Sequence, residues 1–153
     1  MSTQGKPPVH ITTTFVRGEE FRSEAVGQRT LTLDGHSKAG QSPPEALLSA
    51  LASCTMVDTV EVLRKKRTPV SSAECRVTGE RFNGVPARFI AITLEYHLNG
   101  EGITAGGAEQ AIDLAVNKYC TVRESLDPAI RMTTRLVLNG ATHPDKDATK
   151  GRA

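Results

Sequence analysis

The sequence predicts an α+β domain in which short strands and two helices share one core. Segments of strand length carry alternating apolar and polar residues, and two longer segments carry apolar residues at a three-four spacing. Turn residues separate these segments and give the order β-β-β-α-β-β-α-β, which is typical of an α+β fold. The 153 residues are enough for one domain with a real core.

The first half of the chain is expected to hold three strands and a long helix. The strands are predicted at residues 10–16, 21–27 and 28–34. A loop then leads to Ser42, and Glu45 three positions later completes a capping box at the start of the helix. Thr68-Pro69 ends the helix, whose apolar positions are Leu47, Leu48, Leu51, Cys54, Val57, Val60 and Leu63.

The second half predicts a hairpin, a helix and a final strand. Alternation over 71–82 and 89–98 indicates two strands around Asn83-Gly84. Thr104 can cap a helix at 108–120, a further turn follows, and 130–138 is the last strand. We therefore expect a flexible N-terminus at 1–8, a folded domain at 9–138 and, because the rest is polar, a disordered tail at 139–153.

Composition narrows the class of protein. The 19 Lys and Arg nearly balance the 17 Asp and Glu, which argues against a nucleic-acid binder. The N-terminus lacks the apolar segment of a secretory signal, and no uninterrupted apolar run has the length of a membrane span. We expect a cytoplasmic protein without a membrane partner, whose three cysteines stay reduced.

Two of the cysteines lie on the predicted helices. Cys54 stands in a helical stretch without charged residues, and Cys120 ends the second helix. Each is either a buried, inert apolar residue or part of a thiol site. Cys75 alternates with apolar residues on a strand and is interpreted as a core residue, and the spacing of the three does not fit a zinc site.

Motifs on both helices carry a resemblance to a known family. They are Asp34-Gly35, the run from Ser42 to Leu48, the run from Ala50 to Cys54, and Lys118-Tyr119-Cys120-Thr121-Val122. In this order they resemble the OsmC/Ohr family of thiol-dependent peroxidases, most of all its YhfA-like branch. The resemblance implies two central helices packed against antiparallel sheets, in an intertwined homodimer whose active sites combine residues of both chains.

The resemblance also implies a reaction. Cys54 would attack the peroxide oxygen, and Cys120 would resolve the resulting sulfenic acid. The substrate would be an organic hydroperoxide, and an external dithiol such as dihydrolipoamide would be the reductant, with no bound cofactor. An arginine from the N-terminal strands, held by a glutamate near the start of the first helix, would stabilise the thiolate.

This chain offers two arginines for that role. A free thiol has a pKa of about 8.5, and burial raises it, so the thiolate needs a nearby cation. Arg22 follows Gly18 in a G-x-x-x-R spacing and is favoured, and Arg17 is the alternative. Glu45 would hold the arginine, but it precedes Cys54 by nine residues, one fewer than is typical of the peroxidases. Solvated arginines and a purely capping Glu45 remain open.

Two other functions therefore stay open. The same pocket at a dimer interface could bind a small apolar ligand or a thiol metabolite without catalysis. Alternatively, the protein could be a stress-response scaffold that has no small-molecule site.

Overall fold

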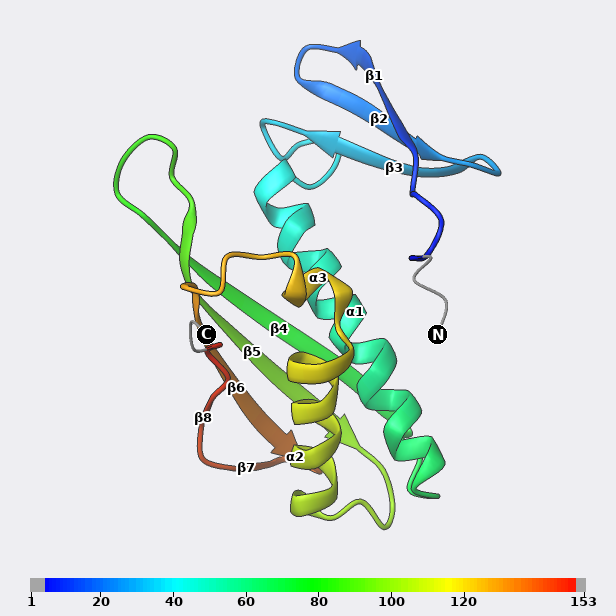
Figure 1. The fold of residues 1–153 in the computed structure, drawn as a ribbon, viewed down its shortest axis with the longest axis vertical. Helices are drawn as coiled ribbons and strands as arrows, with labels where there is room; N and C mark the ends of the chain where they lie inside the picture. The colour runs from blue at the N-terminus through cyan, green and yellow to red at the C-terminus, as the bar shows by residue number, and fades with distance from the viewer. Residues whose placement is uncertain (1–4, 151–153) are drawn as a thin grey trace. The chain divides into compact units, whose positions relative to one another are not determined.

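The computed structural model describes residues 5–150, and its elements keep the predicted order (Figure 1). They are β1 (Ile11–Arg17), β2 (Glu20–Ala25), β3 (Arg29–Asp34), α1 (Pro43–Lys65), β4 (Ser72–Arg81), β5 (Phe89–Asn99), α2 (Ala105–Leu114), η1 (Ala115–Tyr119), α3 (Thr121–Glu124), β6 (Arg131–Leu138), β7 (Ala141–Thr142) and β8 (Lys146–Asp147). The chain divides into two compact units, Met1–Leu47 and Leu48–Ala153. Of the predicted flexible N-terminus, residues 1–4 lie outside the described residues, and residues 5–10 form neither helix nor strand.

The first unit is an antiparallel sheet in the order β1–β2–β3. Gly18 (φ +51°) and Gly27 (φ +84°) lie in its two turns, where glycine adopts a positive φ without strain. After β3, the Asp34 carboxylate accepts backbone hydrogen bonds from Ala39 (2.9 Å) and His36 (2.8 Å). These donors lower the pKa of Asp34 and hold the loop that leads to α1.

The capping box that the sequence predicts is present at the start of α1. The backbone N–H of Ser42 donates to Glu45 Oε2 (2.7 Å), and the backbone N–H of Glu45 donates to Ser42 Oγ (3.4 Å). The two side chains thus satisfy backbone donors that have no partner inside the helix. This reciprocal cap fixes where α1 begins.

The second unit is built on a sheet in the order β4–β5–β6–β7, with β8 also paired to β6. The β4–β5 hairpin is antiparallel, as predicted. The β5–β6 pair is parallel, from Ala91 opposite Arg131 to Leu98 opposite Leu138, so the expectation of antiparallel sheets is corrected at this pair. Parallel neighbours need a crossover connection, and here α2, η1 and α3 form it.

The predicted helix at 108–120 is neither uniform nor continuous. It begins earlier, at Ala105, where the Thr104 side chain accepts a hydrogen bond from the backbone N–H of Gly107 (3.0 Å). The last five residues, Ala115–Tyr119, form a π-helix, in which the N–H of Cys120 donates to the carbonyl of Ala115 (2.9 Å). Cys120 itself is extended (φ −71°, ψ 107°) and joins this turn to α3. Apolar spacing alone does not distinguish five residues of π-helix from α-helix.

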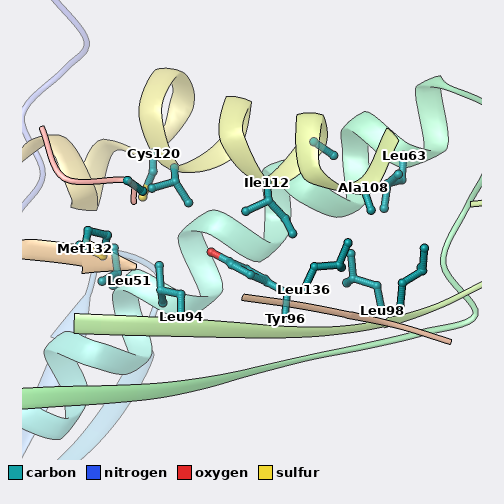
Figure 2. Close-up of a cluster of buried hydrophobic side chains, with 14 of the residues drawn as sticks. Leu51, Leu63, Leu94, Tyr96, Leu98, Ala108, Ile112, Cys120, Met132 and Leu136 are labelled. Carbon is teal, nitrogen blue, oxygen red and sulfur yellow. The ribbon is translucent and has the colours of Figure 1, made fainter. Parts of the chain in front are cut away.

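One face of this sheet carries the core. Figure 1 shows α2 lying along the sheet, and Figure 2 shows side chains of α1 and α2 meeting those of the strands. The labelled residues, all buried, are Leu51, Leu63, Leu94, Tyr96, Leu98, Ala108, Ile112, Cys120, Met132 and Leu136. Alternate residues of β5 and β6 supply the sheet side, as expected for strands with one buried face.

A chain of hydroxyl hydrogen bonds crosses this core. Tyr96 on β5 points toward α1 (Figure 2), and its hydroxyl donates to Thr55 Oγ1 (2.8 Å). Thr55 in turn donates to the carbonyl of Ala52 (3.0 Å). Both side chains are completely buried, so each hydroxyl needs a partner inside the protein. The pair therefore ties α1 to β5 at one register.

The predicted disordered tail is wrong over 141–150. Strands β7 and β8 pair with β6, and the N–H of Ala148 donates to the carbonyl of Met132 (2.8 Å). Ala148 is 8% exposed, and Lys146 forms an ion pair with Glu109 on α2 (2.7 Å). The polar tail covers the free edge of β6 through backbone hydrogen bonds, which need no apolar pattern. Residues 151–153 lie outside the described residues.

Helix α1 is long enough, and its mean hydropathy is high enough, to cross a membrane. Polar residues nevertheless interrupt its apolar sequence. A core helix of a soluble protein meets the same criterion. Leu51 and Leu63 of α1 belong to the core described above. The absence of a membrane partner stays a prediction.

We predict that Tyr96 and Thr55 stabilise the protein jointly. Replacing Tyr96 by Phe removes the donor to Thr55 and should lower the free energy of unfolding by about 1 kcal/mol. Chemical denaturation of Tyr96→Phe, Thr55→Val and the double variant measures this. The double variant should lose less than the sum of the single losses, because the two changes remove one interaction. Strictly additive losses would show that the hydroxyls are not coupled.

Candidate functional site

The structure brings the two helix cysteines together. Cys54 projects from α1 and is half-buried, whereas Cys120 is 3% exposed. Both thiols are free, and a side-chain hydrogen bond joins them. They are 66 positions apart in the sequence (120 minus 54), so the fold alone makes this contact.

The surroundings of Cys120 favour the neutral thiol. Its pKa is raised to about 11, mainly by burial. The hydrogen bond and charge of Cys54 contribute to this rise, whereas the backbone N–H of Arg123, which donates to Cys120 Sγ (3.2 Å), acts in the opposite direction.

Arg123 is a site residue that sequence reasoning missed. It lies on α3, three positions after Cys120, and its side chain is completely buried. Among the described residues, Nε, Nη1 and Nη2 have no hydrogen-bond partner. Burial lowers the pKa of its guanidinium, and negative charge at Cys120 raises it. The sequence shows the C-x-x-R spacing, but an arginine beside Glu124 is typical of a solvated helix turn.

Cys75 is a core residue, as the sequence predicted. It lies on β4 and packs against the buried cluster. Burial, and then the charge of Glu95, raise its pKa to about 12. A thiol in this setting stays protonated near neutral pH and is a poor nucleophile.

The other three predicted site residues have local partners in the first unit. Arg17 pairs with Glu20 (Nε–Oε2 3.3 Å), and Arg22 pairs with Glu24 (Nη2–Oε2 3.0 Å), both largely exposed. The Glu45 carboxylate accepts from the Ser42 N–H and from Ser37 Oγ (3.0 Å). These bonds lower the pKa of Glu45.

In that unit, therefore, Glu45 is held by serines at the helix cap and each arginine by a neighbouring glutamate. Glu45 thus forms the predicted helix cap. A role for Arg22, Arg17 or Glu45 beside the thiols stays a prediction.

A shallow cavity opens beside Cys120. It has a volume of about 260 Å³ and is lined by Asn117, Lys118, Tyr119, Cys120, Thr121, Glu124, Ser125 and Lys150. Its wall combines an aromatic ring with polar groups, as small-molecule sites do. Within residues 5–150, no group of three or more His, Cys, Asp and Glu side chains is arranged to hold a metal ion.

Comparison with known proteins shows which sequences this chain resembles. The family model described as OsmC-like protein matches residues 35–135. Protein YhfA of Escherichia coli (strain K12) is 32% identical over 120 residues, a match that covers 78% of this chain and 90% of YhfA.

Two solved structures share the fold. The OsmC-like protein of Mycoplasma pneumoniae superposes with a TM-score of 0.76 at 20% identity, over 88% of this chain and 99% of that one. An organic hydroperoxide resistance protein of Legionella pneumophila gives a TM-score of 0.62 at 12% identity, over 88% of this chain and 98% of that one. At these identities the structures indicate the fold alone. The family model and the likeness to YhfA go further, and they establish that this chain belongs to the OsmC family.

Proposed function

We propose that this protein is a thiol-dependent peroxidase that reduces organic hydroperoxides. The observation that carries the proposal is the contact between Cys54 and Cys120, the second of which lines a cavity that opens to the surface. Membership of the OsmC family supports it, as does the fold shared with an organic hydroperoxide resistance protein. The predicted cytoplasmic location would keep both thiols reduced between turnovers.

The first step would oxidise Cys54. Its thiolate attacks one peroxide oxygen, the S–O bond forms as the O–O bond breaks, and the alkoxide leaves and takes up a proton. The products are a sulfenic acid and an alcohol. Cys54 is the better nucleophile of the pair, because it is half-buried whereas Cys120 is enclosed and its pKa is raised.

The second step would use Cys120. Its sulfur attacks the sulfenic acid sulfur, the S–S bond forms, and the hydroxyl leaves as water. An external dithiol such as dihydrolipoamide then reduces the disulfide by two exchange steps and is itself oxidised to a disulfide. The protein needs no bound cofactor for this cycle.

A second candidate function is binding of a small apolar molecule or a thiol metabolite without turnover. Two observations favour it: Glu45 is occupied as a helix cap, and the pKa of Cys120 is raised to about 11. In that case the cavity beside Cys120 would hold the ligand, and Cys120 would line the site without reacting.

We predict that peroxide consumption depends on Cys54 and Cys120 but not on Cys75. Wild type, Cys54→Ser, Cys120→Ser and Cys75→Ala would be assayed with cumene hydroperoxide, tert-butyl hydroperoxide and hydrogen peroxide, with dihydrolipoamide as reductant. Cys54→Ser should fall to the uncatalysed rate, because it removes the nucleophile. Cys120→Ser should lose the turnover that passes through the Cys54–Cys120 disulfide. Cys75→Ala should consume peroxide at the wild-type rate.

The Cys75→Ala variant is the matched control, since it removes a partly buried thiol on β4 whose pKa is raised and which has no part in the proposed cycle. Equal, negligible rates for wild type and Cys54→Ser would reject the peroxidase and leave ligand binding as the function to pursue.

We further propose that the active form is a homodimer. In the single chain, Asp34 is the sole buried residue among the described residues of the first unit, although Ile11, Phe15 and Leu31 are each more than half exposed. Helix α1 also exposes Val57 (68%) on a face with small neighbours at Ala50 and Ser53. Small exposed residues at this spacing allow close approach of another helix. A second copy of the chain would cover both surfaces.

A charge on the exposed face of α1 tests this proposal. We predict a dimer by sedimentation equilibrium, and a dissociation constant at least about tenfold weaker in Val57→Glu, since a carboxylate would be buried at the interface. Val85→Glu is the matched control, because Val85 is fully exposed in the β4–β5 turn. A monomeric wild type, or equal weakening in both variants, would contradict the proposal.

A further inference from the structure

Arg123 carries a buried cation that is unpaired among the described residues. A guanidinium stays protonated in proteins, so Arg123 cannot escape its burial by losing a proton. A buried charge without a counter-ion or hydrogen bonds is costly, and proteins usually pair or solvate such groups. The side-chain nitrogens of Arg123 have neither solvent nor a hydrogen-bond partner among the described residues. The site is therefore incomplete until an anion forms beside the guanidinium.

The group beside Arg123 that can become an anion is the thiol of Cys120. The backbone N–H of Arg123 already donates to Cys120 Sγ at 3.2 Å. Negative charge at this sulfur favours the protonated form of Arg123. Glu124, the adjacent carboxylate, is mostly exposed and pairs with Lys150 instead. Because Nε, Nη1 and Nη2 are all enclosed, an anion from solution cannot reach them without an opening of the fold.

The other ionisable groups around the thiols do not compete for this role. Cys54 contacts Cys120 from α1 and raises the pKa of Cys120. From β5, Tyr96 interacts with the charge of Cys120, but burial raises the pKa of Tyr96 and its hydroxyl donates to Thr55. Arg123 is the cationic group of α3 that interacts with the charge of Cys120.

We propose that the Arg123 guanidinium is the counter-ion of the thiolate formed at the Cys54–Cys120 pair, and that it sets the reactivity of both sulfurs. This role rests on the thiol chemistry of the proposed function. Arg123, which lies in the second unit, would supply the stabilising cation that the sequence analysis assigned to Arg22 or Arg17. Arg123 acts on the sulfurs and not on the peroxide, so it is a positioning residue.

A redox consequence follows from the same charge. In the disulfide neither sulfur is an anion, and Arg123 loses its counter-ion. The reduced, ionised pair is therefore stabilised relative to the disulfide, which makes the disulfide easier to reduce. The dithiol that closes the cycle would benefit directly from this effect.

The test is the pH profile of alkylation of the reduced protein by iodoacetamide, in a Cys75→Ala background that leaves only the pair. Neutral variants Arg123→Met and Arg123→Gln are compared with Arg123→Lys, which keeps the charge. The lower macroscopic pKa of the pair should rise by about one unit or more in the neutral variants, the size of effect that an adjacent cation produces. Arg123→Lys should stay close to the parent protein.

A second readout is the equilibrium with a dithiol. The disulfides of the neutral variants should need a higher ratio of reduced to oxidised dithiol for half-reduction than the parent protein does. Circular dichroism verifies that each variant is folded, and Met at this position removes a buried unpaired charge that itself opposes folding.

Superimposable alkylation profiles of the parent and a folded neutral variant would overturn the inference. A folded Arg123→Lys variant whose cysteine pair has the alkylation profile of a free cysteine would also overturn the inference, even if neither neutral variant folds. Alkylation needs no peroxide, so this outcome is separate from the peroxidase assay. If the pKa of the pair depends on Arg123 but the protein consumes no peroxide, the peroxidase proposal is rejected and the counter-ion role of Arg123 stands.

Discussion

The parallel pairing of β5 with β6 is the constraint on which the candidate site depends. Two strands that are consecutive in the sheet and parallel cannot be joined by a tight turn, so the chain must cross over between their opposite ends. The crossover carries α2 along the sheet face and ends at Cys120 and α3 before β6 begins. Because α1 contributes to the same core, the end of the crossover meets α1 near Cys54.

The π-helix gives this meeting its local geometry. Over Ala115–Tyr119 the hydrogen bonds span one more residue than in an α-helix, and Cys120 then leaves the helix in an extended conformation. Short π-helices frequently occur at functional sites, since they redirect side chains without ending an element. Here the turn directs Cys120 into the core and starts α3, which buries Arg123 next to it. One irregularity therefore places two residues of the site.

Much of this fold could be predicted from the sequence because most of its signals are local. Alternation, the capping box at Ser42 and the spacing of apolar residues predicted seven of the eight strands and helices within a few residues, all except the helix at 108–120. The core role of Cys75 followed from its position on a predicted strand. The resemblance placed Cys54 and Cys120 in one site before any contact was known. Features that depend on partners far along the chain could not be predicted this way. They include the parallel β5–β6 pair, the tail strands that cover β6, and the burial of Arg123, which is followed in the sequence by the polar residues Glu124 and Ser125.

One equivalent of tert-butyl hydroperoxide, added to the fully reduced protein without any dithiol, tests the pairing of the two thiols most directly. Intact mass spectrometry should show the loss of two hydrogen atoms, peptide mapping should find a Cys54–Cys120 disulfide, and one equivalent of alcohol should form. A lasting sulfenic acid at Cys54 that is trapped by dimedone, a disulfide through Cys75, or an unoxidised protein would contradict the account.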